Sequence, residues 1–332
     1  MKVALLGDGG WGTALALTLV RNGHAPRVWG PAADYIGEIR HARLNRKFLP
    51  GVPLPEEIEW TADPDEALAG AEAVVMVVPS KYVRTTLGRF AAAYRAAGSP
   101  PVVSATKGFD ESTQERMTEI LSELWFVRQP AALSGPSIAP ETARGVPTAV
   151  TIACADAALA RRFQELFTGD TFRVYTSDDV RGVELGGALK NVIALAAGVC
   201  DGLGFGNNAK AALITRGLAE MTRLGVALGA HPQTFYGLSG IGDLMVTCMS
   251  PQSRNRTVGE RLGRGEPLSR ILSGMEQVAE GVCTCGPALA LARAAGVPAP
   301  VMEQVDAVVH GGKKPKDAVV ELMRRDPRAE RD

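Results

Sequence analysis

Gly7-Asp8-Gly9-Gly10-Trp11-Gly12, close to the start of the chain, is the stretch that decides the fold. A short apolar run typical of a β-strand precedes it, and a pattern typical of an α-helix, from Thr13 to Asn22, follows it. A glycine-rich turn between a strand and a helix is typical of a dinucleotide-binding unit, whose pyrophosphate lies at the positive end of the helix. An ordinary tight turn is the alternative. We predict a dinucleotide site, because strand and helix flank the glycines on the correct sides.

The three glycines at this motif's defining positions have separate expected roles. Gly7 permits the tight turn, Gly9 lets the backbone approach the pyrophosphate, and Gly12 packs the helix against the strand. NAD-selective folds usually carry an acidic residue at the end of the second strand, where it binds the ribose 2′-hydroxyl. This chain has Trp29-Gly30-Pro31 there, with neither an acid nor an arginine, so the motif does not choose between NAD and NADP.

Working outward from the turn, short apolar runs alternate with helical patterns. The runs predicted as strands are Lys2 to Leu6, Pro26 to Trp29, Val74 to Val78, Val102 to Ala105, Ala131 to Leu133, Ala149 to Ala153 and Phe172 to Tyr175. A strand that is apolar at every position, such as Val74 to Val78, has helices on both faces. The pattern therefore predicts an α/β fold with a Rossmann-type doubly wound sheet.

The hydrophobic period changes after about Ser177, where the strand patterns stop. Helical spacing then dominates at Val180 to Val199, Ala209 to Leu228, Val258 to Leu262 and Pro287 to Ala295. We predict a dinucleotide-binding domain over residues 1–178 and an all-helical substrate and catalytic domain over residues 179–325. The highly charged residues 326–332 are expected to form a frayed tail.

Composition excludes several classes of protein. Lys plus Arg and Asp plus Glu number 36 each, so no overall charge favours nucleic acid or an anionic membrane as a partner. The apolar run before Asp8 is too short for a signal peptide, so we expect a cytoplasmic protein. The five scattered cysteines suit free thiols. Cys283-Thr284-Cys285 lacks further ligands at metal-binding spacing, and no metal site is predicted.

Two lysines are candidates for chemistry. Lys107 directly follows a predicted strand, at the carboxyl edge where α/β sheets bind ligands; a solvated loop lysine is the alternative. Lys190 interrupts a strongly apolar helix, where an unpaired ammonium would be costly. Either its side chain extends to solvent, or it is a catalytic lysine that faces a cleft.

A third candidate is the start of a helix after residue 250. Ser250 and Pro251 form a cap and first-turn pair, which predicts a helix whose first turn presents Ser253, Arg254 and Asn255. Cations are unfavourable at a helix N-terminus unless an anion is nearby. The pattern therefore predicts a phosphate site, with a solvated basic turn as the alternative.

Together these segments resemble the bacterial NAD(P)-dependent glycerol-3-phosphate dehydrogenases over nearly the whole chain. The resemblance is carried by Gly7 to Thr13, Phe48 to Gly51, Ser104 to Gly108, Leu133 to Ser137, Val183 to Asn191, Ala211 to Gly217, Gly242-Asp243, Ser253 to Arg256 and Val278 to Gly281. It implies a helical domain like that of 6-phosphogluconate dehydrogenase-like enzymes, a homodimer, and NAD or NADP as cofactor. It also implies interconversion of dihydroxyacetone phosphate and sn-glycerol 3-phosphate, which supplies phospholipid synthesis.

The resemblance further implies residue roles. Lys190 would be the catalytic acid/base, assisted by Lys107 and Asp243. The residues that would surround the substrate are Lys107, Gly135, Ser137, Lys190, Asp243, Ser253, Arg254 and Asn255. Those that would bind the cofactor are Gly7, Gly9, Gly10, Trp11, Gly12, Phe48, Lys107, Ala139, Arg254, Val278 and Glu280. Lys107 would lower the pKa of Lys190 and Asp243 would raise it, so the net direction stays open.

Gly30-Pro31 departs from the resemblance, because many relatives carry a basic residue there. That departure puts NADP preference in doubt without establishing NAD preference. A related β-hydroxyacid or 6-phosphogluconate type dehydrogenase is the nearest alternative function. A non-catalytic NAD(P)-sensing protein is another, although it would leave Lys107, Lys190 and Asp243 without a purpose.

Overall fold

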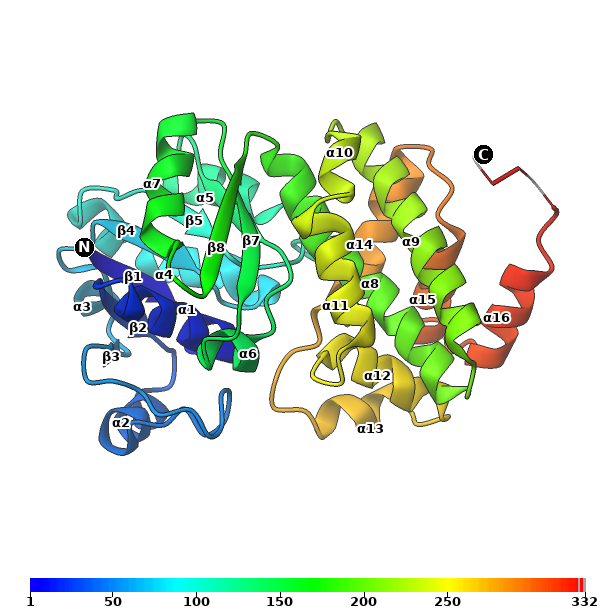
Figure 1. Cartoon of the computed structure of the whole chain (residues 1–332), viewed down its shortest axis with the longest axis horizontal. Coiled ribbons are helices and arrows are strands. Elements are labelled where there is room, and N and C mark those ends of the chain that lie inside the picture. Colours follow the sequence, from blue (N-terminus) through cyan, green and yellow to red (C-terminus); the bar gives the residue numbers. More distant parts are fainter. Residues whose placement is uncertain (328, 331–332) are drawn as a thin grey trace.

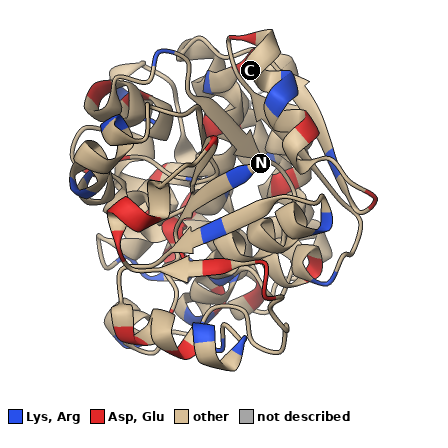
Figure 2. Cartoon of the chain, turned by 90° about the vertical axis from the view of Figure 1, so that its left-hand side faces the viewer, with Lys and Arg blue, Asp and Glu red and all other residues tan. Residues whose placement is uncertain are grey.

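The computed structural model describes residues 1–327 and 329–330, and shows a sheet domain followed by a helical domain (Figure 1). The predicted tail includes residues 328, 331 and 332, which lie outside the described residues. On the side of the molecule drawn in Figure 2, basic and acidic residues are interspersed. This distribution matches the equal numbers of the two charges in the sequence.

The sheet has eight strands in the order β3-β2-β1-β4-β5-β6-β7-β8. All neighbouring pairs are parallel except β6 and β7. The strands are β1 (Lys2–Leu6), β2 (Ala25–Trp29), β3 (Glu59–Thr61), β4 (Ala73–Met76), β5 (Val102–Ser104), β6 (Ala131–Ser134), β7 (Thr148–Ala153) and β8 (Phe172–Ser177). The chain crosses from one side of β1 to the other between β3 and β4, which creates a ligand-binding crevice at the carboxyl ends of β1 and β4.

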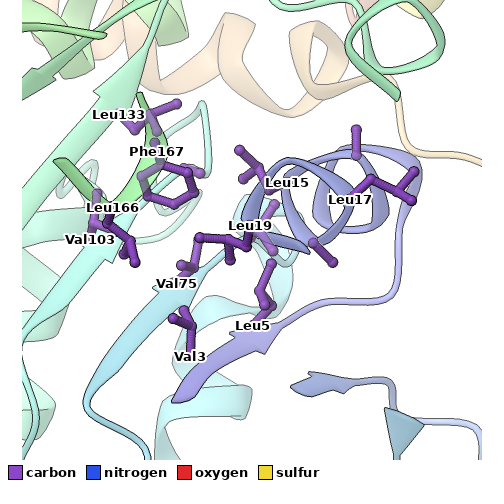
Figure 3. Packing of buried hydrophobic residues seen from close by; sticks show 14 of the residues in the cluster. Val3, Leu5, Leu15, Leu17, Leu19, Val75, Val103, Leu133, Leu166 and Phe167 are labelled. Carbon is purple, nitrogen blue, oxygen red and sulfur yellow. The ribbon is translucent and has the colours of Figure 1, made fainter. Parts of the chain in front are cut away.

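Helices cover both faces of this sheet, as the apolar strands predict. They are α1 (Gly10–Arg21), α2 (Ala33–Ala42), α3 (Pro64–Leu68), η1 (Ser80–Tyr82), α4 (Val83–Ala96), α5 (Met117–Trp125), α6 (Ala139–Ala143) and α7 (Ala157–Phe167). Alternate residues of β1 belong to different cores: Val3 and Leu5 pack with α1, whereas Ala4 and Leu6 pack with α4 and α5. Figure 3 shows Val3 and Leu5 on the face of the sheet that α1 covers.

The second domain contains only helices within the described residues. They are α8 (Val180–Gly202), α9 (Asn207–Ala227), α10 (Pro232–Phe235), η2 (Leu238–Gly242), α11 (Asp243–Met249), α12 (Arg254–Gly263), α13 (Leu268–Ser273), α14 (Glu280–Ala294), α15 (Pro300–Val309) and α16 (Pro315–Met323). Helix α8 is long and apolar enough to cross a membrane, but it is buried at the centre of this domain. It packs against α9, α11, α12 and α14, so an all-round apolar helix is the expected composition.

The predicted fold class is confirmed, with local corrections. The sequence reasoning missed β3, because three residues at a sheet edge are too few to show a period. Helix α1 begins at Gly10 instead of Thr13, since Gly9 already accepts the first helical hydrogen bond from Thr13 N. Helix α14 begins at Glu280 and contains Pro287, which had been expected at its start.

The predicted start of the helix after residue 250 is wrong. Ser250 and Pro251 lie in a turn, in which Ser253 N donates to Ser250 O at 3.1 Å. Helix α12 begins at Arg254, and Ser253 is its cap, since Ser253 Oγ accepts from Arg256 N at 3.3 Å. The basic residue is therefore the first residue of the helix.

Candidate active site

The glycine turn joins β1 to α1 at the carboxyl edge of the sheet. Gly7 has a φ of +135°, and a Cβ atom there would lie 2.8 Å from the backbone of Val77. A Cβ at Gly12 would overlap the carbonyl oxygen of Gly7, so no other residue allows the helix to begin so close to the strand. A Cβ at Gly9 would meet no atom within 4 Å. The turn is therefore tight toward the protein and open at Gly9, as close approach of a pyrophosphate requires.

Residues expected at the cofactor surround this turn. A Cβ at Gly10 would lie 2.5 Å from Phe48 O and 3.8 Å from Ala139 Cβ. Phe48 O accepts a hydrogen bond from Gln277 Nε2 at 3.3 Å, which brings a segment of the helical domain to the turn. Trp11 Nε1 is buried without a hydrogen-bond partner in the described chain. The open position and the unpaired donor both fit a bound dinucleotide.

Glu280, Val278 and Arg254 gather at the N-terminal ends of α14 and α12. Glu280 accepts from Ser80 N at 3.0 Å and from Ser80 Oγ at 2.5 Å, and burial raises the pKa of its carboxyl group. Arg254 Nη1 donates to Val278 O at 2.8 Å. Ser80 is the first residue of η1, in the segment after β4, and a Cβ at Gly108 would lie 2.8 Å from its side chain. Glu280 therefore connects the helical domain to the crevice beside β4.

A lysine–aspartate–lysine cluster lies where the two domains meet. Asp243, the first residue of α11, is 1% exposed and uses both carboxylate oxygens. Oδ2 accepts from Lys107 Nζ at 2.6 Å, and Oδ1 accepts from Lys190 Nζ. Lys190 also donates to Thr247 Oγ1 at 2.8 Å. Lys107 donates to Gly135 O at 3.0 Å. The alternative that the Lys190 side chain extends to solvent is therefore wrong, because this residue is 6% exposed. The alternative that Lys107 is a solvated loop lysine is also wrong, because its ammonium group is paired with Asp243.

The loop after β6 completes this cluster on the sheet side. Lys107 Nζ lies 3.3 Å from Ser137 Oγ, which itself donates to Gly135 O at 2.8 Å. Lys107 and Gly135 follow neighbouring strands, so their loops meet at one sheet edge. Side chains from the sheet domain and from α8 and α11 therefore converge on one carboxylate.

Burial and charge set the ionisation of this cluster. Desolvation lowers the pKa of Lys190 to about 7; the Asp243 carboxylate opposes this shift, and the Lys107 ammonium adds to it. Burial alone would raise the pKa of Asp243, but the two ammonium groups outweigh burial and lower it. The sequence left the direction for Lys190 open, and the structure gives it. Lys190 exchanges its proton near neutral pH, while Asp243 stays ionised.

The three polar residues at the start of α12 differ in how their side chains are bonded. Asn255 is buried; its Nδ2 donates to Asn191 Oδ1 at 2.9 Å, and its Oδ1 accepts from Gly281 N at 2.8 Å. The hydroxyl of Ser253 caps the helix. Arg254 is exposed, and one donor of its guanidinium is used on Val278. Of the three residues predicted for the phosphate, Arg254 is the one whose remaining donors lack partners among the described residues.

The sequence reasoning missed three polar residues of the site. Thr247 lies one helical turn after Asp243, and that spacing was a usable signal. Asn191, adjacent to Lys190, holds Asn255 in place. Ser80 follows β4 at the ligand-binding edge, in the same kind of position that singled out Lys107. No group of three or more His, Cys, Asp or Glu side chains with metal-binding geometry occurs within residues 1–327 and 329–330.

A glycine turn at the carboxyl edge of a doubly wound sheet, together with a buried lysine of pKa about 7 from a helical domain, is the combination expected of a two-domain nicotinamide-dependent dehydrogenase. Residues 2–160 match the family described as NAD-dependent glycerol-3-phosphate dehydrogenase N-terminus, and residues 179–320 match its C-terminus. The chain belongs to the bacterial NAD(P)-dependent glycerol-3-phosphate dehydrogenases, and it is an oxidoreductase that uses a nicotinamide dinucleotide.

Individual relatives agree along the full length. The chain is 49% identical to glycerol-3-phosphate dehydrogenase [NAD(P)+] of Citrifermentans bemidjiense, covering 99% of this chain and 98% of that one. It is 48% identical to the enzyme of the same name from Geobacillus kaustophilus, covering 100% and 96%. The crystal structure of glycerol-3-phosphate dehydrogenase from Coxiella burnetii superposes with a TM-score of 0.93 at 37% identity, covering 98% and 99%.

The fold extends to a further class of reductase. A ketopantoate reductase from Ralstonia eutropha shares the fold at a TM-score of 0.61 and 18% identity. The predicted fold, family, enzyme class and use of NAD or NADP are confirmed.

Proposed function

We propose that this enzyme interconverts dihydroxyacetone phosphate and sn-glycerol 3-phosphate with Lys190 as its acid/base. The observation that carries the proposal is the buried Lys190 ammonium, whose pKa of about 7 makes both of its protonation states available at neutral pH. A general acid or base works best when its pKa lies near the working pH.

The cluster supplies a proton donor for reduction and a proton acceptor for oxidation. When bound, the nicotinamide ring gives or takes the hydride at the substrate carbon. In reduction, Lys190 Nζ donates a proton to the oxygen on which negative charge develops; in oxidation, the neutral amine accepts that proton. Lys107 stabilises the same oxygen electrostatically from the sheet side. Asp243 holds both ammonium groups in place, and its fixed charge keeps a proton on Lys190 that burial would otherwise remove.

The substrate phosphate binds at the start of α12. Arg254 offers a charged fork of donors beside the free N–H groups of a ten-residue helix whose dipole favours an anion. Ser253 and Asn255 shape this site, since one caps the helix and the other fixes it against α8 and α14. Binding of the remote phosphate positions the carbonyl carbon for hydride transfer.

The dinucleotide lies across the glycine turn. Gly7, Gly9, Gly10 and Gly12 admit the pyrophosphate at the N-terminus of α1. The residues that line the rest of this path are Trp11, Phe48, Lys107, Ala139, Arg254, Val278 and Glu280. The close packing of Phe48 and Ala139 on Gly10, and of Glu280 on Ser80, supports this path.

The setting of the enzyme is also part of the proposal. The enzyme acts in the cytoplasm as a homodimer, without nucleic-acid or membrane partners, and supplies glycerol phosphate for phospholipid synthesis. Residues 1–178 form its dinucleotide-binding domain, and residues 179–325 form its catalytic domain. The family membership supports the metabolic role, and the change from strands to helices between Ser177 and Val180 supports the boundary.

The pH dependence of both directions tests the acid/base assignment. Reduction needs the ammonium form of Lys190, so its rate should fall as pH rises through about 7, whereas oxidation needs the amine and should rise over the same range. The measurement is the kcat of dihydroxyacetone phosphate reduction and of glycerol phosphate oxidation against pH. Parallel profiles would refute the assignment, and turnover of 6-phosphogluconate in place of the triose phosphate would refute the substrate.

A further inference from the structure

The side chain of Asp8 occupies the space that a side chain at position 30 would need. Asp8 is the second residue of the glycine turn, and Gly30 directly follows β2. A Cβ atom at position 30 would lie 2.5 Å from Asp8 Oδ2, 2.6 Å from Asp8 Cγ and 2.8 Å from Ile36 Cδ1. A side chain at position 30 would displace the Asp8 carboxylate from this place, so the glycine after β2 and the acid in the turn form one structural feature.

The Asp8 carboxylate is buried and, within the described residues, accepts no hydrogen bond from another residue. Asp8 is 9% exposed. Its backbone oxygen accepts a hydrogen bond from Asn45 Nδ2 at 2.7 Å, but this bond does not involve the carboxylate. In residues 1–327 and 329–330, the only hydrogen bond to the carboxylate comes from its own backbone N–H. Burial accordingly raises the pKa of Asp8 to about 6. A buried carboxylate without donors is costly, and a ligand with hydroxyl groups would remove that cost.

The position of this carboxylate matches a known requirement of dinucleotide folds. Selectivity for NAD comes from an acid at the end of the second strand, which accepts hydrogen bonds from the adenosine ribose and repels a 2′-phosphate. Here the acid reaches the same place from the glycine turn. We propose that Asp8 is the specificity residue of this enzyme, which binds the adenosine ribose hydroxyls of NAD and disfavours NADP.

The charges around Asp8 do not offer a phosphate site in its place. Lys47 is the cation whose field reaches the Asp8 carboxylate. Its Nζ lies 3.7 Å from Glu276 Oε2 and 5.3 Å from the centre of the Phe48 ring, so a second carboxylate already faces it. Two acids against one lysine favour an uncharged ribose over a phosphorylated one.

Binding of cofactor fragments to the wild-type enzyme tests the proposal without turnover. Isothermal titration calorimetry at about pH 8, where the Asp8 carboxylate is ionised, compares ADP-ribose with its 2′-phosphate and NADH with NADPH. We expect the unphosphorylated member of each pair to bind about tenfold or more tightly. Equal affinities, or tighter binding of the 2′-phosphates, would overturn the proposal.

Two variants assign the preference to this residue. D8N keeps the shape of the side chain and removes its charge, so NADPH should bind more tightly and NADH less tightly. The ratio of NADH affinity to NADPH affinity should fall by about tenfold. D34N removes an exposed carboxylate from the first turn of α2 and should leave the ratio unchanged. An unchanged ratio in D8N, or an equal change in D34N, would contradict the assignment. Thermal unfolding checks that both variants fold. If D8N does not fold, the comparison of NADH with NADPH on the wild-type enzyme still tests the proposed preference for NAD.

Discussion

The glycine turn and the lysine–aspartate–lysine cluster, to which we assign the cofactor and the reacting group of the substrate, are built by opposite means. The turn spans residues 7–12, and its packing depends on atoms that are missing: a Cβ at Gly7 or Gly12 would collide with backbone. The cluster joins Lys107 from the loop after β5, Lys190 from α8 and Asp243 from α11, and it depends on the charges of these side chains. The turn is a local arrangement of backbone, which we propose binds the cofactor, whereas the cluster brings together charges far apart in the sequence, which we propose transfer the proton.

The two regions also differ in what they cost the fold. The turn needs only glycines, each of which adds some conformational entropy to the unfolded chain. The cluster buries the Lys190 ammonium and the Asp243 carboxylate and partly buries the Lys107 ammonium, and their desolvation is expensive even when they are paired. Apolar residues of similar volume often stabilise a fold as well as a buried ion pair does, so stability alone does not account for these three charges. Substitutions in the two regions should therefore separate cofactor binding from turnover.

The largest effect is expected from Lys190→Met, which removes the acid/base and keeps an unbranched apolar side chain in α8. The kcat should fall by about 10²–10⁴-fold, because the group that we assign as the proton donor is removed. The affinity for NADH, measured by fluorescence titration, should stay within about twofold of wild type, since the glycine turn is untouched. Near-normal turnover would rule out the acid/base role, and loss of NADH binding would show that the two regions are not separable.

The next largest effect is expected from Asp243→Asn. Because the Asp243 carboxylate raises the pKa of Lys190, loss of this carboxylate should lower the pKa of Lys190 from about 7 to a smaller value. Less ammonium would be present at neutral pH, so reduction should slow by about 10–100-fold and its decline with pH should move to lower pH. The control is Thr247→Val, which removes a hydrogen bond to Lys190 but no charge, and should leave the pH of the decline nearly in place. An unmoved decline in Asp243→Asn would contradict this account.

A smaller effect, mainly on substrate binding, is expected from Arg254→Ala when the cofactor is saturating. Loss of the guanidinium should raise the KM for dihydroxyacetone phosphate by about tenfold or more and change kcat less. Arg264→Ala is a matched control, because it removes an exposed arginine from the other end of α12. Steady-state kinetics of both variants at saturating NADH gives the comparison. An unchanged KM in Arg254→Ala would place the phosphate elsewhere.

The same contrast explains what the sequence could reveal. The turn, the long strands and α8 are visible because their signals lie within a few consecutive residues. The edge strand β3 was missed because the three residues Glu59–Thr61 are too few to show a repeating pattern. The start of α12 was misplaced because Ser250 and Ser253 are both plausible caps, and only the folded chain chooses between them. The sequence therefore predicted those features that a single short segment determines.

The cluster shows where that reading stops. Lys190 was conspicuous as a charge in an apolar helix, but its partner Asp243 is 53 positions further along the chain. The direction of the Lys190 pKa depends on its burial and on distances to two opposite charges, none of which the sequence contains. The pairing of Asp8 with Gly30 was likewise invisible, because it depends on the direction of one side chain.

The smallest effect, and the sharpest test of the turn, is expected from Gly9→Ala. A Cβ there would meet no protein atom within 4 Å, so the variant should fold with nearly unchanged stability, yet the methyl group would enter the space that we assign to the pyrophosphate. NADH should bind about tenfold more weakly, with little change in kcat at saturating cofactor. Gly88→Ala is the matched control, since a Cβ at this position of α4 also meets no atom, and it should leave NADH binding unchanged. If Gly9→Ala bound NADH normally, the open side of the turn would not be where the cofactor lies, and the division between a binding region and a chemical region would have to be redrawn.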